Sequence, residues 1–199
     1  MPRPRAQLDQ AAIAEAFAPD GLHGVSAAMV ARAAGVAKPT LYVHGNSKEA
    51  VFLACVEAEV ERLLNRLYDA GVRTRDGSPA ARAGALATAI LDHARAHPAG
   101  ARLLYVTARH TDSSVAAQVD ATLARVPARV AELLRREPDG ADGLSESVAT
   151  ALVGAAAALA LTPTPHTHSV AARLGETLAE TLEPAPVATG DAVTSIGIY

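Results

Sequence analysis

Apolar residues recur at helical spacing along most of the chain, and short clusters of glycine, proline and polar residues separate the apolar segments. In the first segment, Leu8, Ala12 and Phe17 fall near one face of a helix. Ser26 and Ser47 each stand before an apolar run, where a serine hydroxyl caps the start of a helix. The pattern predicts helices over residues 6–18, 27–34, 38–44, 48 to 67–71, 79–97, 99–110, 114–136, 144–161 and 168–182.

The breaks between these helices have local causes. A Pro-Asp-Gly run at 19–21 stops the first helix, and Gly35 supplies the left-handed turn that ends the second. Residues 71–78 are rich in glycine and charge and are expected to form a connector. Pro127 lies inside the helix predicted at 114–136, which it should kink or split because proline lacks the backbone N–H and crowds the preceding turn.

Composition favours an all-α fold. Half of the 199 residues are hydrophobic, largely alanine, and the aromatic residues are only four tyrosines and two phenylalanines, so closely packed helices are expected rather than sheets. Cys55, the one cysteine, lies in an apolar run and is expected to be a buried structural thiol. No apolar stretch approaches the length that crosses a bilayer, and no signal-type core follows the N-terminus. We therefore expect a cytoplasmic protein with no membrane partner.

Charge is spread unevenly along a chain whose net charge is -3. Residues 1–48 hold five basic and three acidic residues, which include both lysines of the chain, Lys38 and Lys48. The remaining residues carry the acidic excess. The N-terminal end is therefore the candidate for contact with nucleic-acid phosphates.

Residues 26–44 have the layout of a helix-turn-helix. Two short predicted helices are joined by a turn at Gly35, and Ala31 is small enough to let the two helices approach closely. Val36 is placed to fill the space between them. The outer face of the second helix is then free to enter a major groove of DNA.

The chain resembles the tetracycline-repressor (TetR) family of bacterial regulators in this region. That family places an aromatic, a glycine and an apolar residue upstream of the motif, where this chain has Phe17, Gly21 and Val25. The resemblance keeps its register over about forty residues of the chain. Within and beyond the motif, the matching residues are Ser26, Val30, Ala31, Ala34, Gly35, Val36, Leu41, Tyr42, His44 and Lys48.

The resemblance implies a role for each matching DNA-facing residue. Ser26 and Lys48 would contact phosphate, and Tyr42 would contact the DNA backbone and pack. Arg3 and Arg5 resemble a mobile arm that reaches the backbone or a minor groove. The residues implied to face the bases are Lys38, Pro39, Thr40 and His44.

The rest of the chain is expected to form the body of a homodimeric regulator. We divide the chain into a DNA-binding domain (1–48), a helical ligand-binding and dimerisation domain (49–183) and a tail (184–199). The small-sided run 153–161 and the last helix are the candidate dimer interface, the alternative being a helix buried within one chain. A small-molecule effector of unknown identity is expected in the body, where polar-tipped residues on apolar helices are the candidate pocket residues: Tyr68, Tyr105, Arg109 and His110.

A rival interpretation is a helical metal-binding protein or enzyme that uses its histidines. His93 and His97 stand four apart on one predicted helix, and His166 and His168 flank Thr167. No third or fourth ligand stands at a recognisable spacing, so we expect solvated histidines. No phosphate loop, nucleophile elbow or supported acid/base pair is present in the sequence, so we expect neither an enzyme nor a resident cofactor.

Overall fold

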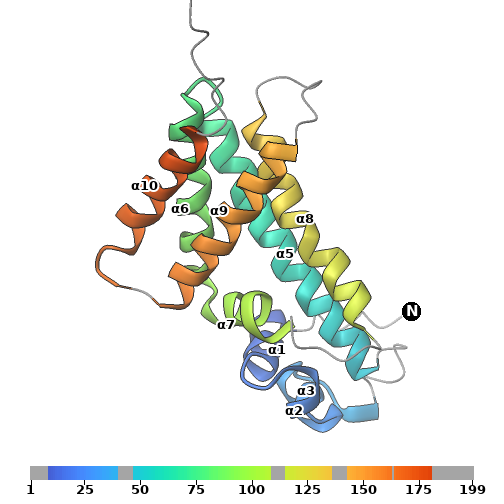
Figure 1. Ribbon diagram of the computed structural model, residues 1–199. Helices are drawn as coiled ribbons and strands as arrows, with labels where there is room; N and C mark the ends of the chain where they lie inside the picture. Colours follow the sequence, from blue (N-terminus) through green and yellow to red (C-terminus); the bar gives the residue numbers. More distant parts are fainter. Residues whose placement is uncertain (1–8, 40–46, 109–114, 136–142, 163, 181–199) are drawn as a thin grey trace, which may run out of the picture.

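Every regular element in the described part of the chain is a helix, which confirms the all-α prediction. The computed structural model describes residues 9–39, 47–108, 115–135, 143–162 and 164–180. The helices are α1 (Gln10–Phe17), α2 (Gly21–Gly24), α3 (Ala27–Ala33), α5 (Lys48–Arg73), α6 (Pro79–Ala96), α7 (Pro98–Arg102), the π-helical turn η1 (Leu103–Thr107), α8 (Ala116–Leu134), α9 (Gly143–Leu161) and α10 (Thr167–Glu180) (Figure 1).

Polar side chains cap the starts of four helices. Asp9 Oδ1 accepts the backbone N–H groups of Ala11 and Ala12, each at 3.1 Å, and so begins α1. The hydroxyl oxygens of Ser26, Ser47 and Ser78 each accept the N–H three residues further on. A free N–H at a helix start has no partner within the helix, so each cap stabilises its helix by about 1 kcal/mol.

The helices form two groups that meet at α7. The long helices α5, α6, α8, α9 and α10 lie together, whereas α1, α2 and α3 gather at one end of the molecule (Figure 1). α6 packs on α5, α9 and α10, and α8 packs on α5 and α9. α7 and η1 both contact α1, so this segment joins the body to the N-terminal helices.

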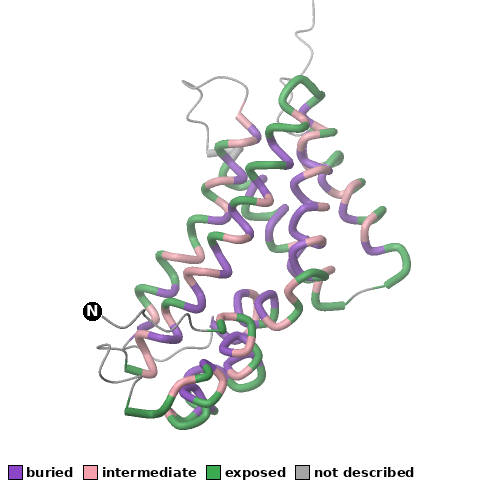
Figure 2. Tube along the Cα trace, turned by 180° about the vertical axis from the view of Figure 1, so that it is seen from behind, coloured by how far each residue is buried: buried purple, intermediate pink, exposed green. Residues whose placement is uncertain are grey.

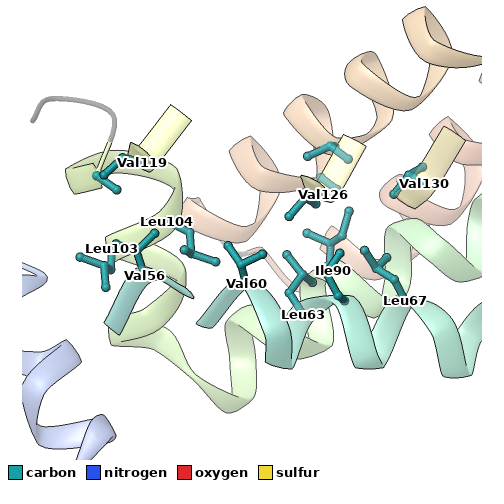
Figure 3. Close-up of a cluster of buried hydrophobic side chains, with 14 of the residues drawn as sticks. Val56, Val60, Leu63, Leu67, Ile90, Leu103, Leu104, Val119, Val126 and Val130 are labelled. Carbon is teal, nitrogen blue, oxygen red and sulfur yellow. The ribbon is translucent and has the colours of Figure 1, made fainter. Parts of the chain in front are cut away.

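One apolar core runs through both groups. The buried faces of the helices point toward one another (Figure 2). The rings of Phe17 and Phe52 meet edge to face with centroids 5.1 Å apart, which ties α1 to α5. In the body the core includes Val56, Val60, Leu63, Leu67, Ile90, Leu103, Leu104, Val119, Val126 and Val130 (Figure 3).

At two glycines the structure has helix where the sequence predicted none. The 19–21 run does not only stop the first helix, because a further short helix, α2, starts at Gly21 with a positive φ of 65°. α5 continues past Gly71 to Arg73, into the predicted connector. An added Cβ at Gly71 would lie 2.7 Å from Leu133 Cδ2, so glycine permits close approach of α8 here.

The structure also differs from the sequence prediction in the region from α7 to α8. The expected helix at 99–110 is a short α-helix followed by the π-helical turn η1. Pro127 does not split α8, which runs unbroken from Ala116 to Leu134. α8 buries Val119, Val126 and Val130 along its length, and this packing outweighs the cost of about 3 kcal/mol for an internal proline.

Within the described ranges, no helix has the length and apolar character that crossing a bilayer requires. Cys55 is buried as predicted, and burial raises the pKa of its thiol to about 12. A thiol with so high a pKa stays protonated, so the structural reading of Cys55 is confirmed.

Candidate DNA interface and effector groove

The turn after α3 has the geometry expected of a helix-turn-helix. Gly35 has a φ of 70°, its N–H donates to Arg32 O at 3.1 Å, and Val36 N–H donates to Ala31 O at 2.9 Å. This pair of bonds is the Schellman arrangement that ends a helix with a left-handed residue. Ala31 is buried and Val36 is packed against the core, as the sequence predicted.

The structure describes four of the nine predicted DNA-contacting residues. Ser26 is exposed at the start of α3, and Lys38 and Pro39 are exposed directly after the turn. Lys48 is half-buried at the start of α5. The starts of α3 and α5, where Ser26 and Lys48 stand, lie at the same end of the molecule as α1 and α2 (Figure 1). The other predicted residues lie outside the described ranges: Arg3, Arg5, Thr40, Tyr42 and His44.

Lys48 has a structural contact that the sequence did not predict. Its Nζ donates a hydrogen bond of 2.7 Å to Leu22 O, which ties the start of α5 to α2. A lysine ammonium carries three hydrogens, so two remain for other acceptors. Lys48 is therefore held in place while it keeps its charge and part of its donor capacity.

A half-open groove lies in the body between η1, α8 and α9. Its cavity has a volume of about 550 Å³. The walls are mainly apolar, and Tyr105, Asp120 and Thr150 contribute the polar groups. The other lining residues are Leu104, Leu123, Ala124, Val126, Pro127, Val153, Gly154, Ala157, Ala158 and Leu161.

A second cavity of about 330 Å³ continues this groove along α8 and α9. Ala124, Pro127 and Thr150 line both cavities. The second cavity extends the groove to Arg135 and Glu146. On α8 the lining residues thus run from position 120 to position 135, about 22 Å along a helix that rises 1.5 Å per residue.

Of the four predicted pocket residues, Tyr105 lines the groove and Tyr68 does not. Tyr68 is 54% exposed on α5 and lies outside this groove, so a pocket role for it stays a prediction. The neighbouring Leu67 is the residue that faces the core, and one position turns a helical side chain by about 100°. Arg109 and His110 lie outside the described residues. The sequence features that coincide with the groove are Pro127 and the small residues of α9.

Glu59 and His93 form a buried polar pair between α5 and α6. Both side chains are almost fully buried, and His93 Nε2 lies 3.7 Å from Glu59 Oε2, too far for a hydrogen bond. Burial, with the positive charges of His97, Arg66 and Arg62, lowers the pKa of His93 to about 4. His93 is therefore neutral at pH 7 and the contact is not an ion pair. Burial raises the pKa of Glu59, an effect that the contact with Arg62 opposes.

The prediction of solvated histidines was therefore wrong for His93. The ring is fully buried because its position on α6 faces α5 rather than solvent. His168 lies 3.0 Å from Asp92 Oδ1, and His166 is exposed. Among the residues that the structure describes, no three His, Cys, Asp or Glu side chains come together as a metal site would need.

Comparison with known proteins agrees with the motif. Residues 11–55 match the family described as "Bacterial regulatory proteins, tetR family". The HTH-type transcriptional activator FasR of Mycolicibacterium smegmatis is 31% identical over 126 residues. That match covers 63% of this chain and 57% of FasR, so the aligned part spans little more than half of that relative.

Two solved structures share the fold across most of this chain. A TetR-like transcriptional regulator from Rhodococcus sp. RHA1 is 28% identical with a TM-score of 0.66, covering 90% of this chain and 97% of its own. The regulator FadR from Bacillus subtilis, solved with stearoyl-CoA, has a TM-score of 0.66 at 13% identity, covering 87% and 98%. The motif and the matched residues are those of bacterial regulatory proteins, and the fold agrees with them. Over residues 11–55 the chain matches the TetR family, and its fold is similar to that of a TetR-like regulator.

Proposed function

We propose that this chain is a homodimeric repressor that binds a near-palindromic operator and is released by a small molecule in the groove of α8 and α9. The observation that carries the DNA-binding part is the α3 turn, which leaves Lys38 and Pro39 exposed next to the ordered cap at Ser26. The proposal keeps the division at 1–48, 49–183 and 184–199. In it, Arg3, Arg5, Thr40, Tyr42 and His44 complete the DNA surface.

The exposed face of α9 supports a second copy of the chain as partner. Ala151 is exposed on this face outside the groove, and its small side chain lets another helix approach closely. Val170 on the neighbouring α10 is 47% exposed. A two-fold axis beside α9 and α10 would bury these side chains and present two reading helices to a palindromic site.

The groove supports an elongated, mainly apolar effector. Its length along α8 and its apolar walls suit a long hydrocarbon chain, and Tyr105 and Thr150 can orient a polar group. Stearoyl-CoA is the molecule named with the Bacillus subtilis structure, so it is the first probe to test.

The DNA-binding proposal is tested by selecting bound sequences from random duplex DNA. We expect a near-palindromic winner. The affinity for it should depend on salt with a slope of about 0.9 per phosphate contact, so Lys48→Ala should flatten the slope by about two units in a dimer. Arg73→Ala, at the far end of α5, removes an equal charge and should leave the slope unchanged. Failure to enrich any sequence would reject the proposal, and an unchanged slope for Lys48→Ala would reject its phosphate contact.

The groove is tested by filling it with a side chain. Ala124 is exposed and lines both cavities, and the chain has no tryptophan, so Ala124→Trp both fills the groove and adds a fluorescent reporter. We expect stearoyl-CoA to weaken operator binding of the wild type on the order of tenfold, the usual size of allosteric coupling. Ala124→Trp should bind the operator weakly without the probe and respond to it no further.

The matched control for the groove is Ala121→Trp, an exposed position on α8 that does not line either cavity. It should bind and release DNA as the wild type does. A wild type that ignores stearoyl-CoA would contradict this effector class. Equal behaviour of the two tryptophan variants would contradict the groove as the regulatory site.

A further inference from the structure

Two side chains from opposite ends of η1 meet at one backbone carbonyl of the N-terminal helices. Arg102 Nε donates to Ala18 O at 3.0 Å, and Thr107 Oγ1 donates to the same oxygen at 2.7 Å. Ala18 is the C-terminal cap of α1 and is almost fully buried. Both lone pairs of this carbonyl are thus occupied by the segment that joins the body to α1.

The π-helical register of η1 makes this convergence possible. Ala108 N–H donates to Leu103 O, five residues earlier, as in a π-helix. In an α-helix, two residues five positions apart, such as Arg102 and Thr107, would point about 140° away from each other. The π turn places them on one side of the segment, so the shared acceptor depends on the register of this single turn.

The same turn forms part of the effector groove. Leu104 and Tyr105, two consecutive residues of η1, line the larger cavity. Leu104 is also part of the same buried core cluster as Val56 of α5 (Figure 3). One segment of five residues therefore touches both the groove and the end of α1.

The contact with the N-terminal helices leaves little space for adjustment. An added Cβ at Gly21 would lie 2.7 Å from Thr107 Cγ2, so the start of α2 packs directly on the threonine methyl. Lys48 binds the next residue of α2 through Leu22 O. A displacement of Thr107 is therefore passed to α2, which leads directly into α3 of the DNA-binding motif.

We propose that η1 is a two-state joint, in which the π register holds α1 through the shared Ala18 carbonyl and the α register releases it. The proposal rests on the function proposed above. The α register is the intrinsically favoured one, so the π turn persists through the contacts around it. A molecule that packs on Leu104 and Tyr105 in the groove shifts η1 to the α register, turns Thr107 away from Ala18 and weakens DNA binding.

The test is a double-mutant cycle on the full chain. Thr107→Val keeps the side-chain shape against Gly21 but removes the donor to Ala18. Ala124→Trp serves as a groove occupant that requires no knowledge of the natural ligand. Each change alone should weaken affinity for the selected operator on the order of tenfold. Together they should weaken it no more than either alone, to within about twofold, because both act through one joint.

The control is Thr88→Val, which removes a similar hydroxyl donor, to Gly84 O, on α6 away from the joint. Thr88→Val and Ala124→Trp should act independently on operator affinity, so their fold-changes should multiply in the double variant. If the fold-changes in operator affinity caused by Thr107→Val and Ala124→Trp also multiply in the double variant, the proposed joint is wrong. The proposed DNA-binding function would be unaffected by that result.

A second readout stands even if no operator is found. Amide exchange at 18–24 should be faster on the order of tenfold in Thr107→Val than in Thr88→Val, because local opening controls exchange. Equal exchange in the two variants would overturn the joint.

Discussion

Replacing Gly175 by alanine is expected to destabilise the protein by about 2 kcal/mol or more, although alanine is the better helix former. An added Cβ at Gly175 would lie 2.7 Å from the carbonyl carbon and oxygen of Ala83 and 2.8 Å from Gly84 N. These are backbone atoms of α6, so no side-chain rotation relieves the overlap. α10 must move away, and the fully buried Ala171 and Ala179 lose their packing.

The matched control is Gly154→Ala. Gly154 is also a helical glycine, but an added Cβ there meets nothing within 4 Å, so alanine should stabilise the chain by about 0.5–1 kcal/mol. Urea unfolding of both variants and the wild type measures the free energy of unfolding, which should fall for Gly175→Ala and rise for Gly154→Ala. Equal effects at the two positions would contradict the close α6–α10 crossing. A loss at Gly154 would instead indicate that a second copy covers α9.

The features predicted correctly from the sequence are those with local causes. Ser26 and Ser47 cap helices, and Gly35 takes the left-handed turn, because caps and turns depend on a few neighbouring residues. The helical spacing of apolar residues also predicted the positions of most of the helices. The DNA-binding motif is read from sequence for the same reason, since all of it lies within about twenty residues.

The groove and the joint could not be predicted in this way, because they bring together segments far apart in the chain. Tyr105 and Thr150 line one groove only once η1, α8 and α9 have packed, and no local pattern states which face of a helix will be buried. Tyr68 fitted the same description as Tyr105 and turned out to face solvent. Thr107 reaches Ala18 across 89 positions and through a π turn that helix propensity does not indicate.

Pro127 shows how tertiary contacts override a strong local signal. The residue alone predicts a break in α8, yet the helix continues through it. Pro127 lies in the groove, where it lines both cavities. The free-energy cost of an internal proline therefore falls at the proposed effector site. Functional sites are where a residue often breaks the local rules for its secondary structure.

Acid is expected to weaken the fold through His93. The pKa of His93 is lowered from 6.5 to about 4, chiefly by burial and then by the charges of His97, Arg66 and Arg62. Between pH 6.5 and pH 4, His93 is mostly protonated in the unfolded chain and mostly neutral in the folded chain. The free energy of unfolding should therefore fall as pH decreases from 6.5 to 4, by about 2 kcal/mol at pH 5. Glu59, whose pKa is raised, has the opposite sign and offsets part of this loss.

The measurement is urea unfolding at pH 7 and pH 5 for the wild type, His93→Leu and His166→Leu. Leucine at position 93 removes the titrating group and two buried nitrogens without hydrogen-bond partners, so the variant should lose less stability on acidification than the wild type. His166 is exposed, so its variant should follow the wild type. If His93→Leu loses as much as the wild type, the acid sensitivity lies elsewhere. A smaller loss would assign the acid sensitivity to His93 at the α5–α6 interface.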